Sequence, residues 1–260
     1  MPLGATPERV IEILPLLAGF TERQWAYPRV EDLEMIDNIL DLNKMTVEEA
    51  IDALGTVCAD FLLVCYFNGE NFPCFQNHKF MTFVESYTYL GACCSFNYNP
   101  KANDQDEHFI SNFFGINGGL NVIGTGRPQL SDGKSGAVYS EGFVVLVHHP
   151  NDFPVESSPT TYIQINKETF IDVQPIESSC SNQVLNLDFE QRKCIIPSDL
   201  NVKSYRQPEC MLGCLRDEIH KRCHCHPFHL PKSDNTTTDY RDCKAKDIMC
   251  FVENYFLKQI

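Results

Sequence analysis

The feature that most constrains the fold of this chain is a stretch of closely spaced cysteines, from Cys194 to Cys250, which holds seven of the thirteen cysteines. Cys210 and Cys214 lie four residues apart, so in a helix both thiols would project from one side. Apolar residues recur in the same segment at helical spacing, at Leu212, Leu215 and Ile219. This pattern predicts an amphipathic helix that ends near Cys223.

Two interpretations of the residues after this helix remain open. Pro227 and Pro231 disfavour further helix, and a nested pair of disulfides would join the helix end to the downstream segment: Cys225 with Cys243 inside Cys223 with Cys250. Each such closure could contribute about 3 kcal/mol. The Cys-His-Cys-His run also offers ligands that zinc prefers. However, Cys-x-Cys is tighter than the usual zinc spacing, so the sequence favours disulfides over a metal.

Composition places the chain in an oxidising compartment and excludes some partners. Thirteen cysteines favour disulfide bonding, and their odd number leaves at least one thiol free or bonded to something else. The formal net charge of −14 argues against nucleic acid as a partner. No apolar run of about 20 residues occurs, and the first residues lack the pattern of a signal peptide. For a cysteine-rich chain without either feature two explanations stay open: its thiols are reduced, or it is an incomplete piece of a larger protein.

The first part of the chain, residues 1–64, is predicted to be helical. Thr6 followed by Pro7 is typical of an N-cap with proline at the first helical position, and Thr46 with Glu49 matches a capping box. Apolar stripes at helical spacing follow both signals, which indicates core packing. Their residues are Val10, Ile13, Leu14, Leu17, then Leu33, Ile36, Ile39, Leu40, then Ile51, Leu54, Val57, Cys58 and Phe61.

A change to strand patterns comes next. Asn68-Gly69 marks a turn that would bring Cys65 and Cys74 together. The segment from Gly91 to Tyr98 is predicted to be a strand, so the neighbouring Cys93 and Cys94 point to opposite faces and should have different partners. Residues 100–142 are rich in glycine and predict turns between short strands. Gly133-Lys134-Ser135 resembles the end of a phosphate-binding loop, but Pro128 stands where its first glycine is required, which excludes that motif.

Four further strands are predicted at 142–150, 161–166, 168–175 and 185–189, the first of them buried and ended by Pro150. Strands grouped between two helical regions indicate an α+β fold. His148 and His149 would face opposite sides of a strand, so a joint catalytic or metal role is disfavoured. Neither a Gly-x-Ser-x-Gly nor a His-Glu-x-x-His motif is present. The sequence therefore predicts no enzyme, no metal and no cofactor.

The ordered series of these motifs resembles the extracellular region of the degenerin/epithelial sodium channel family, most closely its insect pickpocket branch. No single piece is diagnostic, but their order is specific and covers nearly the whole chain. The pieces are Cys65-x8-Cys74, Gly91-Ala-Cys93-Cys94-Ser-Phe-Asn97, 142–150, 168–175, Gln191-Arg-Lys-Cys194, Tyr205-Arg-x3-Cys210-x3-Cys214, and Cys223-x-Cys225-x-Pro227-x3-Pro231 with Cys243 and Cys250 behind.

The resemblance implies a disulfide-rich ectodomain with a helical finger at 1–64, a β-rich palm and β-ball at 65–193 and an incomplete helical thumb at 194–260. It implies three pairs: Cys65–Cys74, Cys223–Cys250 and Cys225–Cys243. Partners for Cys194, Cys210 and Cys214 would lie beyond Ile260, and the partner of Cys93 before Met1. Cys58, Cys94 and Cys180 are left without an assignment.

The family further implies one subunit of a homo- or heterotrimeric, ligand- or mechanically-gated, amiloride-sensitive sodium channel of the plasma membrane. This region would be its extracellular, stimulus-sensing part and would be unable to conduct alone. Acidic side chains could meet between finger and thumb in a proton-sensitive cluster, although solvated helix faces are the favoured interpretation. Those side chains are Glu31, Asp32, Asp217 and Glu218. Asn235 begins a glycosylation sequon in a polar loop. The alternative function is a secreted, cysteine-rich binding or decoy protein.

Overall fold

The computed structural model describes residues 5–20, 28–54, 58–75, 82–99, 108–115, 117–126, 142–176, 180–200, 205–232 and 240–254. Its α-helices are α1 (Pro7–Ile13), α2 (Val30–Asn43), α3 (Val47–Leu54), α4 (Cys58–Phe61), α5 (Asn182–Leu185), α6 (Phe189–Arg192), α7 (Gln207–Cys223) and α8 (Ile248–Glu253). Three 3-10 helices accompany them: η1 (Leu14–Phe20), η3 (Pro197–Asp199) and η4 (Ala245–Asp247). The strands are β1 (Leu62–Phe67), β2 (Glu70–Phe72), β3 (Phe83–Thr88), β4 (Gly91–Phe96), β5 (Leu120–Gly124), β6 (Gly142–Leu146) and β7 (Thr160–Gln164).

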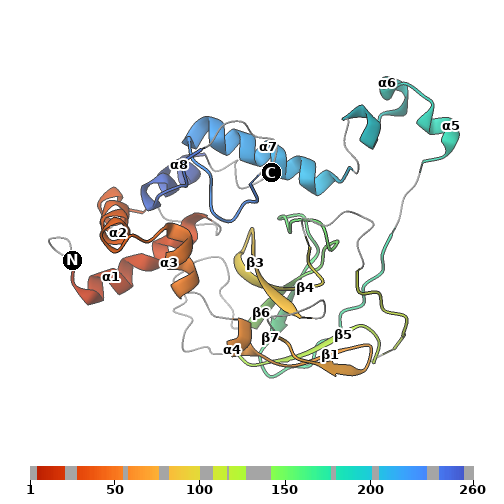
Figure 1. Cartoon of the computed structure of the whole chain (residues 1–260), viewed down its shortest axis with the longest axis horizontal. Coiled ribbons are helices and arrows are strands. Elements are labelled where there is room, and N and C mark those ends of the chain that lie inside the picture. Colours follow the sequence, from red (N-terminus) through yellow and green to blue (C-terminus); the bar gives the residue numbers. More distant parts are fainter. Residues whose placement is uncertain are drawn as a thin grey trace.

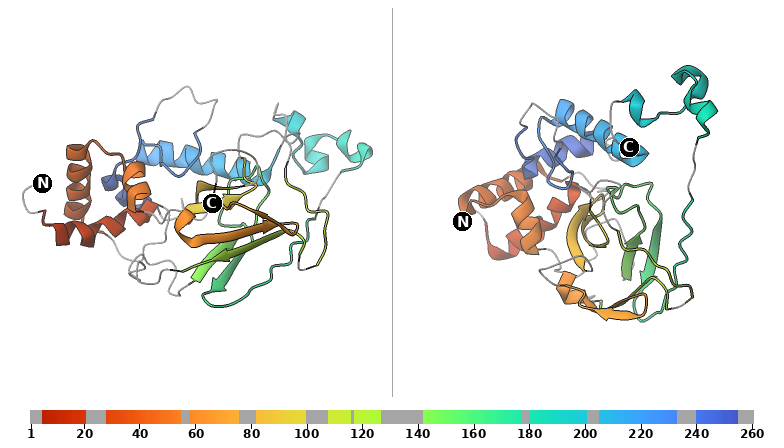
Figure 2. Two further views of the ribbon diagram at one scale, coloured as in Figure 1. Left: turned by 60° about the horizontal axis from the view of Figure 1, so that its bottom comes forward. Right: turned by 45° about the vertical axis from the view of Figure 1, so that its right-hand side comes forward.

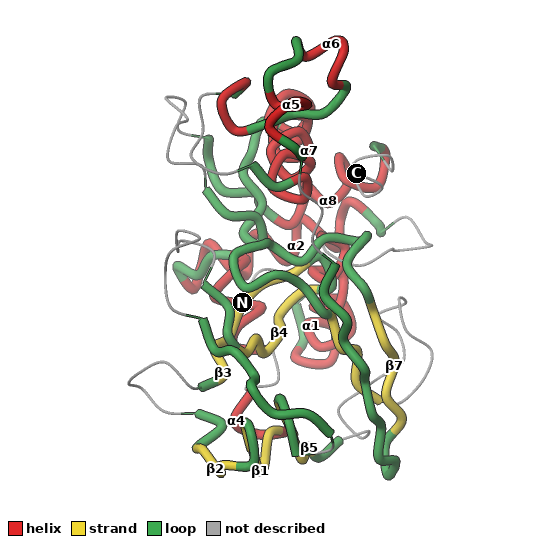
Figure 3. Tube along the Cα trace, turned by 90° about the vertical axis from the view of Figure 1, so that its right-hand side faces the viewer, coloured by secondary structure: helices red, strands yellow, loops and turns green. Residues whose placement is uncertain are grey.

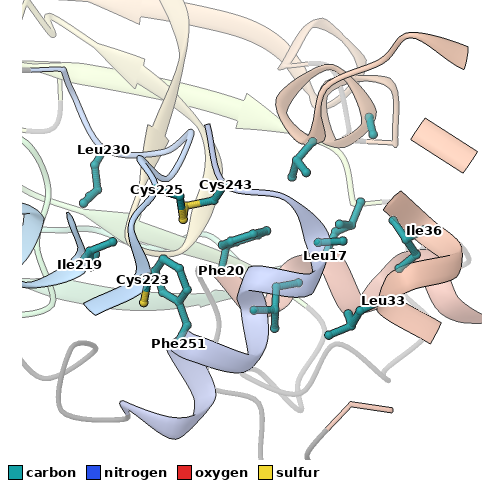
Figure 4. Close-up of a cluster of buried hydrophobic side chains, with 14 of the residues drawn as sticks. Leu17, Phe20, Leu33, Ile36, Ile219, Cys223, Cys225, Leu230, Cys243 and Phe251 are labelled. Atoms are coloured by element: carbon teal, nitrogen blue, oxygen red, sulfur yellow. A yellow bond between two sulfur atoms is a disulfide. The ribbon is translucent and has the colours of Figure 1, made fainter. Parts of the chain in front are cut away.

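Helices from both ends of the chain pack together into one helical unit, formed by α1, η1, α2, α3, α7, η4 and α8 (Figure 1). Their apolar stripes converge on a single buried cluster, shown in Figure 4. Its members include Ile13, Leu17, Phe20, Leu33, Ile36, Leu40, Leu212, Ile219, Ile248 and Phe251. Burying each such side chain contributes about 1.5–3 kcal/mol, so this cluster is the main hydrophobic core of the described chain.

The helix signals in the sequence are confirmed at the atomic level. The Thr6 side chain accepts a hydrogen bond from the Arg9 N–H, and Pro7 opens α1. Thr46 and Glu49 form both bonds of a capping box at 3.1 and 2.8 Å, which fixes the start of α3. The predicted cysteine-bearing helix is α7, with Leu212 and Ile219 buried and both Cys210 and Cys214 exposed.

In the described residues the β-structure consists of three small antiparallel sheets in the order β2-β1-β5, β3-β4 and β6-β7. Asn68 and Gly69 both adopt positive φ and connect β1 to β2, as the sequence predicted. A second, smaller core lies between the first two sheets and contains Phe72, Phe83 and the bonded pair Cys65 and Cys74. The mixed helix-and-strand class is therefore confirmed, with the helical unit and the sheets on different sides of the molecule and the short helix α4 beside β1 (Figures 1 and 3).

Several predicted elements are wrong or misplaced. The helical region ends at Phe61, and Leu62 already begins β1. Residues 168–175 are extended, but they pair with no strand in the described part of the chain. Residues 185–189 are not a strand, since they join the short helices α5 and α6. In the glycine-rich region the sequence did not single out β5. The strand predicted as buried at 142–150 is β6, and it is half-buried.

Two further observations complete the fold. Residues 180–200, which hold α5, α6 and η3, stand away from the rest of the molecule in both views of Figure 2. We call them the outer segment. Among the described helices, none combines the length and the hydropathy that a membrane crossing requires.

Candidate functional site

The candidate functional site is the place where the N-terminal helices pack against α7, η4 and α8, next to the β3–β4 hairpin. Two nested disulfides lie at its centre, because Cys225 bonds Cys243 and Cys223 bonds Cys250. Figure 4 shows Cys223, Cys225 and Cys243 beside Phe20, Ile219 and Phe251. All four half-cystines belong to the main core or pack against it. The sulfurs of Cys223 and Cys225 are thus bonded, which removes two of the thiolates that a zinc site would use.

A buried carboxylate joins the two ends of the chain at this junction. Asp37 lies on the core-facing side of α2, and its two oxygens accept hydrogen bonds from the backbone N–H groups of Ala245 at 2.7 Å and Lys246 at 3.2 Å. Burial raises the pKa of the Asp37 carboxyl, while the two backbone donors partly offset that rise. We call this contact the Asp37 clamp; it places η4 against α2 across more than two hundred residues of sequence.

Surface ion pairs flank the Asp37 clamp. Lys244 contacts Asp41 at 2.8 Å, and the Arg241 guanidinium holds both oxygens of Asp247 at 2.6 and 2.9 Å. Asp247 also accepts a hydrogen bond from the Lys244 N–H at 2.7 Å, so it organises the entry into η4. The Arg241–Asp247 pair is bidentate, which makes it the more directional of the two pairs.

Two buried histidines, His220 and His226, lie close in sequence to the bonded cysteines Cys223 and Cys225. His220 Nε2 is 3.0 Å from His226 Nδ1, and His226 Nε2 is 3.0 Å from the carbonyl oxygen of Leu230. Because a carbonyl only accepts, His226 Nε2 carries a proton, its Nδ1 accepts, and His220 Nε2 donates. Tyr240 stacks on His220 with ring centroids 4.0 Å apart. This relay requires that His226 be neutral.

Burial and neighbouring charges hold the pKa of both rings below the ordinary histidine value. For His220 the causes are loss of hydration, then the nearby His226 ring and Arg216. For His226 the loss of hydration again comes first, and the Leu230 carbonyl opposes it. The sequence run Cys-His-Cys-His drew attention to His224 and His226 as metal ligands, but it gave no signal that His226 would pair with His220 on α7.

Aromatic rings connect the helical unit to the β3–β4 hairpin. Phe228 packs edge-on against both Phe20 of η1 and Tyr87 of β3, with centroids 5.8 and 5.1 Å apart. An open cleft of about 310 Å³ lies beside this contact. Its lining includes Tyr87, Tyr98, Phe153, Phe228, Leu230 and Pro231. Burial raises the pKa of Tyr98 to about 12, so its hydroxyl stays protonated at neutral pH.

The remaining bonded cysteines lie in the β-region. Cys65 bonds Cys74 across the β1–β2 hairpin, and Cys58 of α4 bonds Cys94 of β4. Cys93 carries a free thiol 3.3 Å from the Thr88 hydroxyl, and burial raises the pKa of that thiol. The adjacent residues Cys93 and Cys94 thus have different partners, as the alternation of a strand requires. Sequence reasoning left the Cys58–Cys94 pair unassigned, because the two residues are 36 positions apart.

The other predicted site residues are unbonded or lie outside the described residues. Cys210 and Cys214 are exposed free thiols on α7. Cys180 and Cys194 are also free, and their sulfurs are 3.9 Å apart in the outer segment. Asn235 lies outside the described residues.

Two of the four acidic side chains considered for a proton-sensitive cluster, Asp32 and Glu218, have nearby cationic partners. Asp32 of α2 forms an ion pair with Arg9 of α1, and Glu218 forms pairs with Lys221 and Arg222 on its own helix. The hydrogen bond from Arg222 lowers the pKa of Glu218. These contacts agree with the simpler interpretation of solvated helix faces. The buried acid that joins the two ends of the chain is Asp37, which the sequence analysis did not select.

Comparison with known proteins gives a consistent result. The family model described as amiloride-sensitive sodium channel matches residues 20–260. Sodium channel protein Nach of Drosophila ananassae is 30% identical over 259 residues, which cover 98% of this chain and 48% of that protein. Pickpocket protein 11 of Drosophila melanogaster is 24% identical over 164 residues, or 62% of this chain and 28% of that protein. Epithelial sodium channel subunit gamma-2 of Xenopus laevis is 24% identical over 230 residues, or 82% and 30%.

The alignments also show how much of each relative this chain covers. The chain spans about half the length of the Nach protein and less than a third of the other two.

Proposed function

Because this chain belongs to the amiloride-sensitive sodium channel family, also called the degenerin/epithelial sodium channel family, we propose that it is the extracellular, stimulus-sensing region of one channel subunit. The family consists of ion channels and not of enzymes. In this proposal the complete subunit lies in the plasma membrane, assembles into trimers with itself or with other family members, and admits sodium ions. The region described here does not conduct alone.

The Asp37 clamp is the observation that carries this proposal. A sensing region must convert the arrival of a stimulus into a movement of its helices. Such a movement is transmitted through elements that are packed and hydrogen-bonded to one another. Asp37 on α2 accepts from the backbone at Ala245 and Lys246, next to the nested disulfides. A movement of α2 is therefore coupled to η4 and α8. This geometry supports a finger at 1–64 that acts on a thumb beginning at 194, with 65–193 as palm and β-ball.

The cysteine framework is proposed on the same basis. We assign Cys65–Cys74, Cys223–Cys250 and Cys225–Cys243 to the complete protein, and we add Cys58–Cys94 from the structure. The resemblance implies partners outside the chain for Cys93, Cys194, Cys210 and Cys214. Asn235 is the proposed glycosylation site in the loop between Cys225 and Cys243.

The experiment that tests this function starts from the complete transcript. We expect its reading frame to contain apolar segments of about 20 residues on both sides of this region. The encoded protein, expressed in oocytes alone and with other family subunits, should give an amiloride-sensitive sodium current. Absence of both the apolar segments and the current would contradict the channel assignment and would favour a secreted binding or decoy protein.

The role of the Asp37 clamp is tested in the same recordings. Asp37→Asn keeps the size of the side chain but removes its charge, so the response to stimulus should change while the protein still reaches the surface. Glu34→Gln is the matched control, because Glu34 is exposed on the same helix. An unchanged response in both variants would show that the clamp does not transmit the signal.

A further inference from the structure

The open cleft between β3 and the loop after α7 has two walls that are fixed by bonds within the protein. The first wall is the β3–β4 hairpin, which the Cys58–Cys94 disulfide joins to α4. The second wall begins at Pro227, whose carbonyl accepts a hydrogen bond from the Leu230 N–H at 3.2 Å. The Leu230 carbonyl in turn lies 3.0 Å from a ring nitrogen of His226. The cleft is therefore formed before any ligand arrives, as small-molecule sites usually are.

Aromatic side chains from four parts of the chain line this cleft. They are Tyr87 of β3, Tyr98 beyond β4, Phe153 between β6 and β7, and Phe228 after α7. A cavity of about 150 Å³ holds benzene, so the volume of about 310 Å³ in this cleft has room for one aromatic ring with a short chain attached. The faces of aromatic rings carry negative partial charge and attract cations. The lining thus favours a ligand that has an apolar ring and a positive charge.

Carboxylates give the β3 wall of the cleft a negative charge. Glu85 belongs to the lining, and its Oε1 accepts a hydrogen bond from the Cys58 N–H at 3.3 Å. The Tyr87 hydroxyl donates a hydrogen bond to Asp52 of α3. The pKa of this hydroxyl is raised first by burial, then by that hydrogen bond, and then by the charges of Asp52, Glu48 and Glu85. A cation that enters the cleft on this side therefore meets an attractive field.

Two cationic side chains near the lining already have carboxylate partners. Lys232, which follows the lining residue Pro231, lies 3.3 Å from Asp242. Arg206 lies 2.5 Å from Asp152. Their positive charges are therefore offset, and the charge around the cleft in the described residues stays negative.

We propose that this cleft binds a small organic cation, namely a single aromatic ring on a short chain that ends in an ammonium group. The ring packs among Tyr98, Phe153 and Phe228, and the ammonium lies against Glu85 and the face of Tyr87. The aromatic lining and the carboxylates select this class over a neutral apolar ligand and over an anion. The proposal does not rest on the channel function, because it needs only the folded hairpin and the loop after α7.

A pair of matched probes tests the need for positive charge. The 260-residue chain is titrated with para-fluorophenethylammonium and with the neutral para-fluorophenethyl alcohol, and binding is followed by fluorine NMR of each probe. We expect the ammonium to bind about tenfold more tightly than the alcohol, since both carry the same ring and only one carries the charge. No binding of the ammonium, or equal affinity for the two probes, would overturn the proposal.

Substitutions place the bound probe in the cleft. Glu85→Gln keeps the hydrogen-bond acceptor for the Cys58 N–H and removes the charge, so it should weaken ammonium binding about fivefold and leave the alcohol unchanged. Tyr98→Leu removes a ring of the lining and should weaken both probes. Glu190→Gln, an exposed residue of α6, is the matched control and should change neither. Circular dichroism confirms that each variant is folded. Equal effects of Glu85→Gln and Glu190→Gln would assign the binding to another surface.

The same titration on the complete protein tests whether the cleft stays open there. We expect the preference for the ammonium and its loss in Glu85→Gln to be retained. A complete protein that binds neither probe would show that another segment or subunit fills the cleft, and this result would overturn the proposal while leaving the channel assignment intact.

Discussion

Two regions of this molecule carry cysteines, and they use them in opposite settings. Around the nested disulfides, Cys225 is fully buried, and the main hydrophobic core surrounds the bonds. In the outer segment, Cys180 is exposed and none of the helical residues is buried. The same residue type therefore reinforces an existing core in the first region and stays unbonded outside any core in the second.

This difference changes what replacing a cysteine is expected to do. A disulfide stabilises a protein chiefly by restricting the unfolded chain. Where the surrounding structure stays folded without the bond, losing the bond raises the entropy of the unfolded state alone. Where the cysteine is unbonded and lies outside the core, replacing it leaves global stability nearly unchanged. Four predictions, taken from the largest effect to the smallest, examine this contrast.

Removal of the inner nested disulfide should have the largest effect. The double substitution Cys225→Ala with Cys243→Ala opens a loop of 18 residues inside the core, so we expect a loss of about 3 kcal/mol in the free energy of unfolding. Urea unfolding monitored by circular dichroism would measure it. Cys210→Ser, which changes an exposed and unbonded cysteine on α7, should shift the same curve by less than about 0.5 kcal/mol. Equal losses of unfolding free energy in the two variants would show that the nested disulfide stabilises the protein no more than an exposed, unbonded cysteine does.

Removal of the Asp37 clamp should have the next largest effect. Asp37→Ala leaves the N–H of Ala245 buried without its acceptor, which we expect to cost about 2–3 kcal/mol in the free energy of unfolding. Asp41→Ala removes the exposed pair with Lys244 one turn further along α2 and should cost about 0.5 kcal/mol or less. Urea titrations of the two variants compare them. If Asp41→Ala proves as damaging as Asp37→Ala, the buried contact is not the one that joins the two ends.

Acidification should weaken the core region through its histidine relay. The folded protein lowers the pKa of His220 and His226, so the unfolded chain binds protons first as the pH falls through about 6.5. The histidine contribution is thus fully present above that pH and is lost below it, until the folded-state pKa values are reached. The thermal midpoint should therefore fall as the pH is lowered from about 7.5 to about 5.5, a range above the ordinary pKa values of carboxyl groups.

The double variant His220→Gln with His226→Gln is the control for this prediction. Its thermal midpoint should vary less over the same pH range, because the two groups that titrate differently in the folded and unfolded chains are gone. A midpoint that falls equally in both proteins would assign the pH dependence to other groups.

Substitution of the two free cysteines of the outer segment should have the smallest effect on global stability. For Cys180→Ser with Cys194→Ser we expect a change of less than about 0.5 kcal/mol in the free energy of unfolding, since no described core residue lies in α5 or α6. Limited proteolysis should cut between residues 181 and 193 before it cuts within α7, in both the substituted and the unsubstituted chain. A large global loss, or cleavage of α7 first, would show that the outer segment contributes to the folded core.

Local signals in the sequence predicted the elements whose interactions are local. Thr6 and the Thr46–Glu49 box each act within one helical turn, and Asn68-Gly69 defines its own hairpin. The separation of Cys93 from Cys94 follows from strand alternation alone. These features need no distant residue, and together with the order of the cysteines they were sufficient for the α+β class and for the family.

Where the outcome depended on a distant partner, the sequence was misleading or silent. Residues 168–175 alternate like a strand, but a strand exists only when a neighbour accepts its hydrogen bonds, and the described chain provides none. Residues 185–189 alternate too, yet they run from the last residue of α5 to the first residue of α6, and Arg192 holds the Leu187 carbonyl of this connection.

The sequence by itself thus determined α1 and α3 with their caps, the helix α7, the hairpin turn and the family to which the cysteine pattern belongs. Only the tertiary structure decided that Asp37 would meet the backbone of Ala245, that His220 would donate to His226, and that Cys180 would approach Cys194. The physical reason is the distance along the chain. A cap is decided within four residues, whereas the Asp37 contact spans 208 positions and forms only after two separate apolar faces have packed into one core.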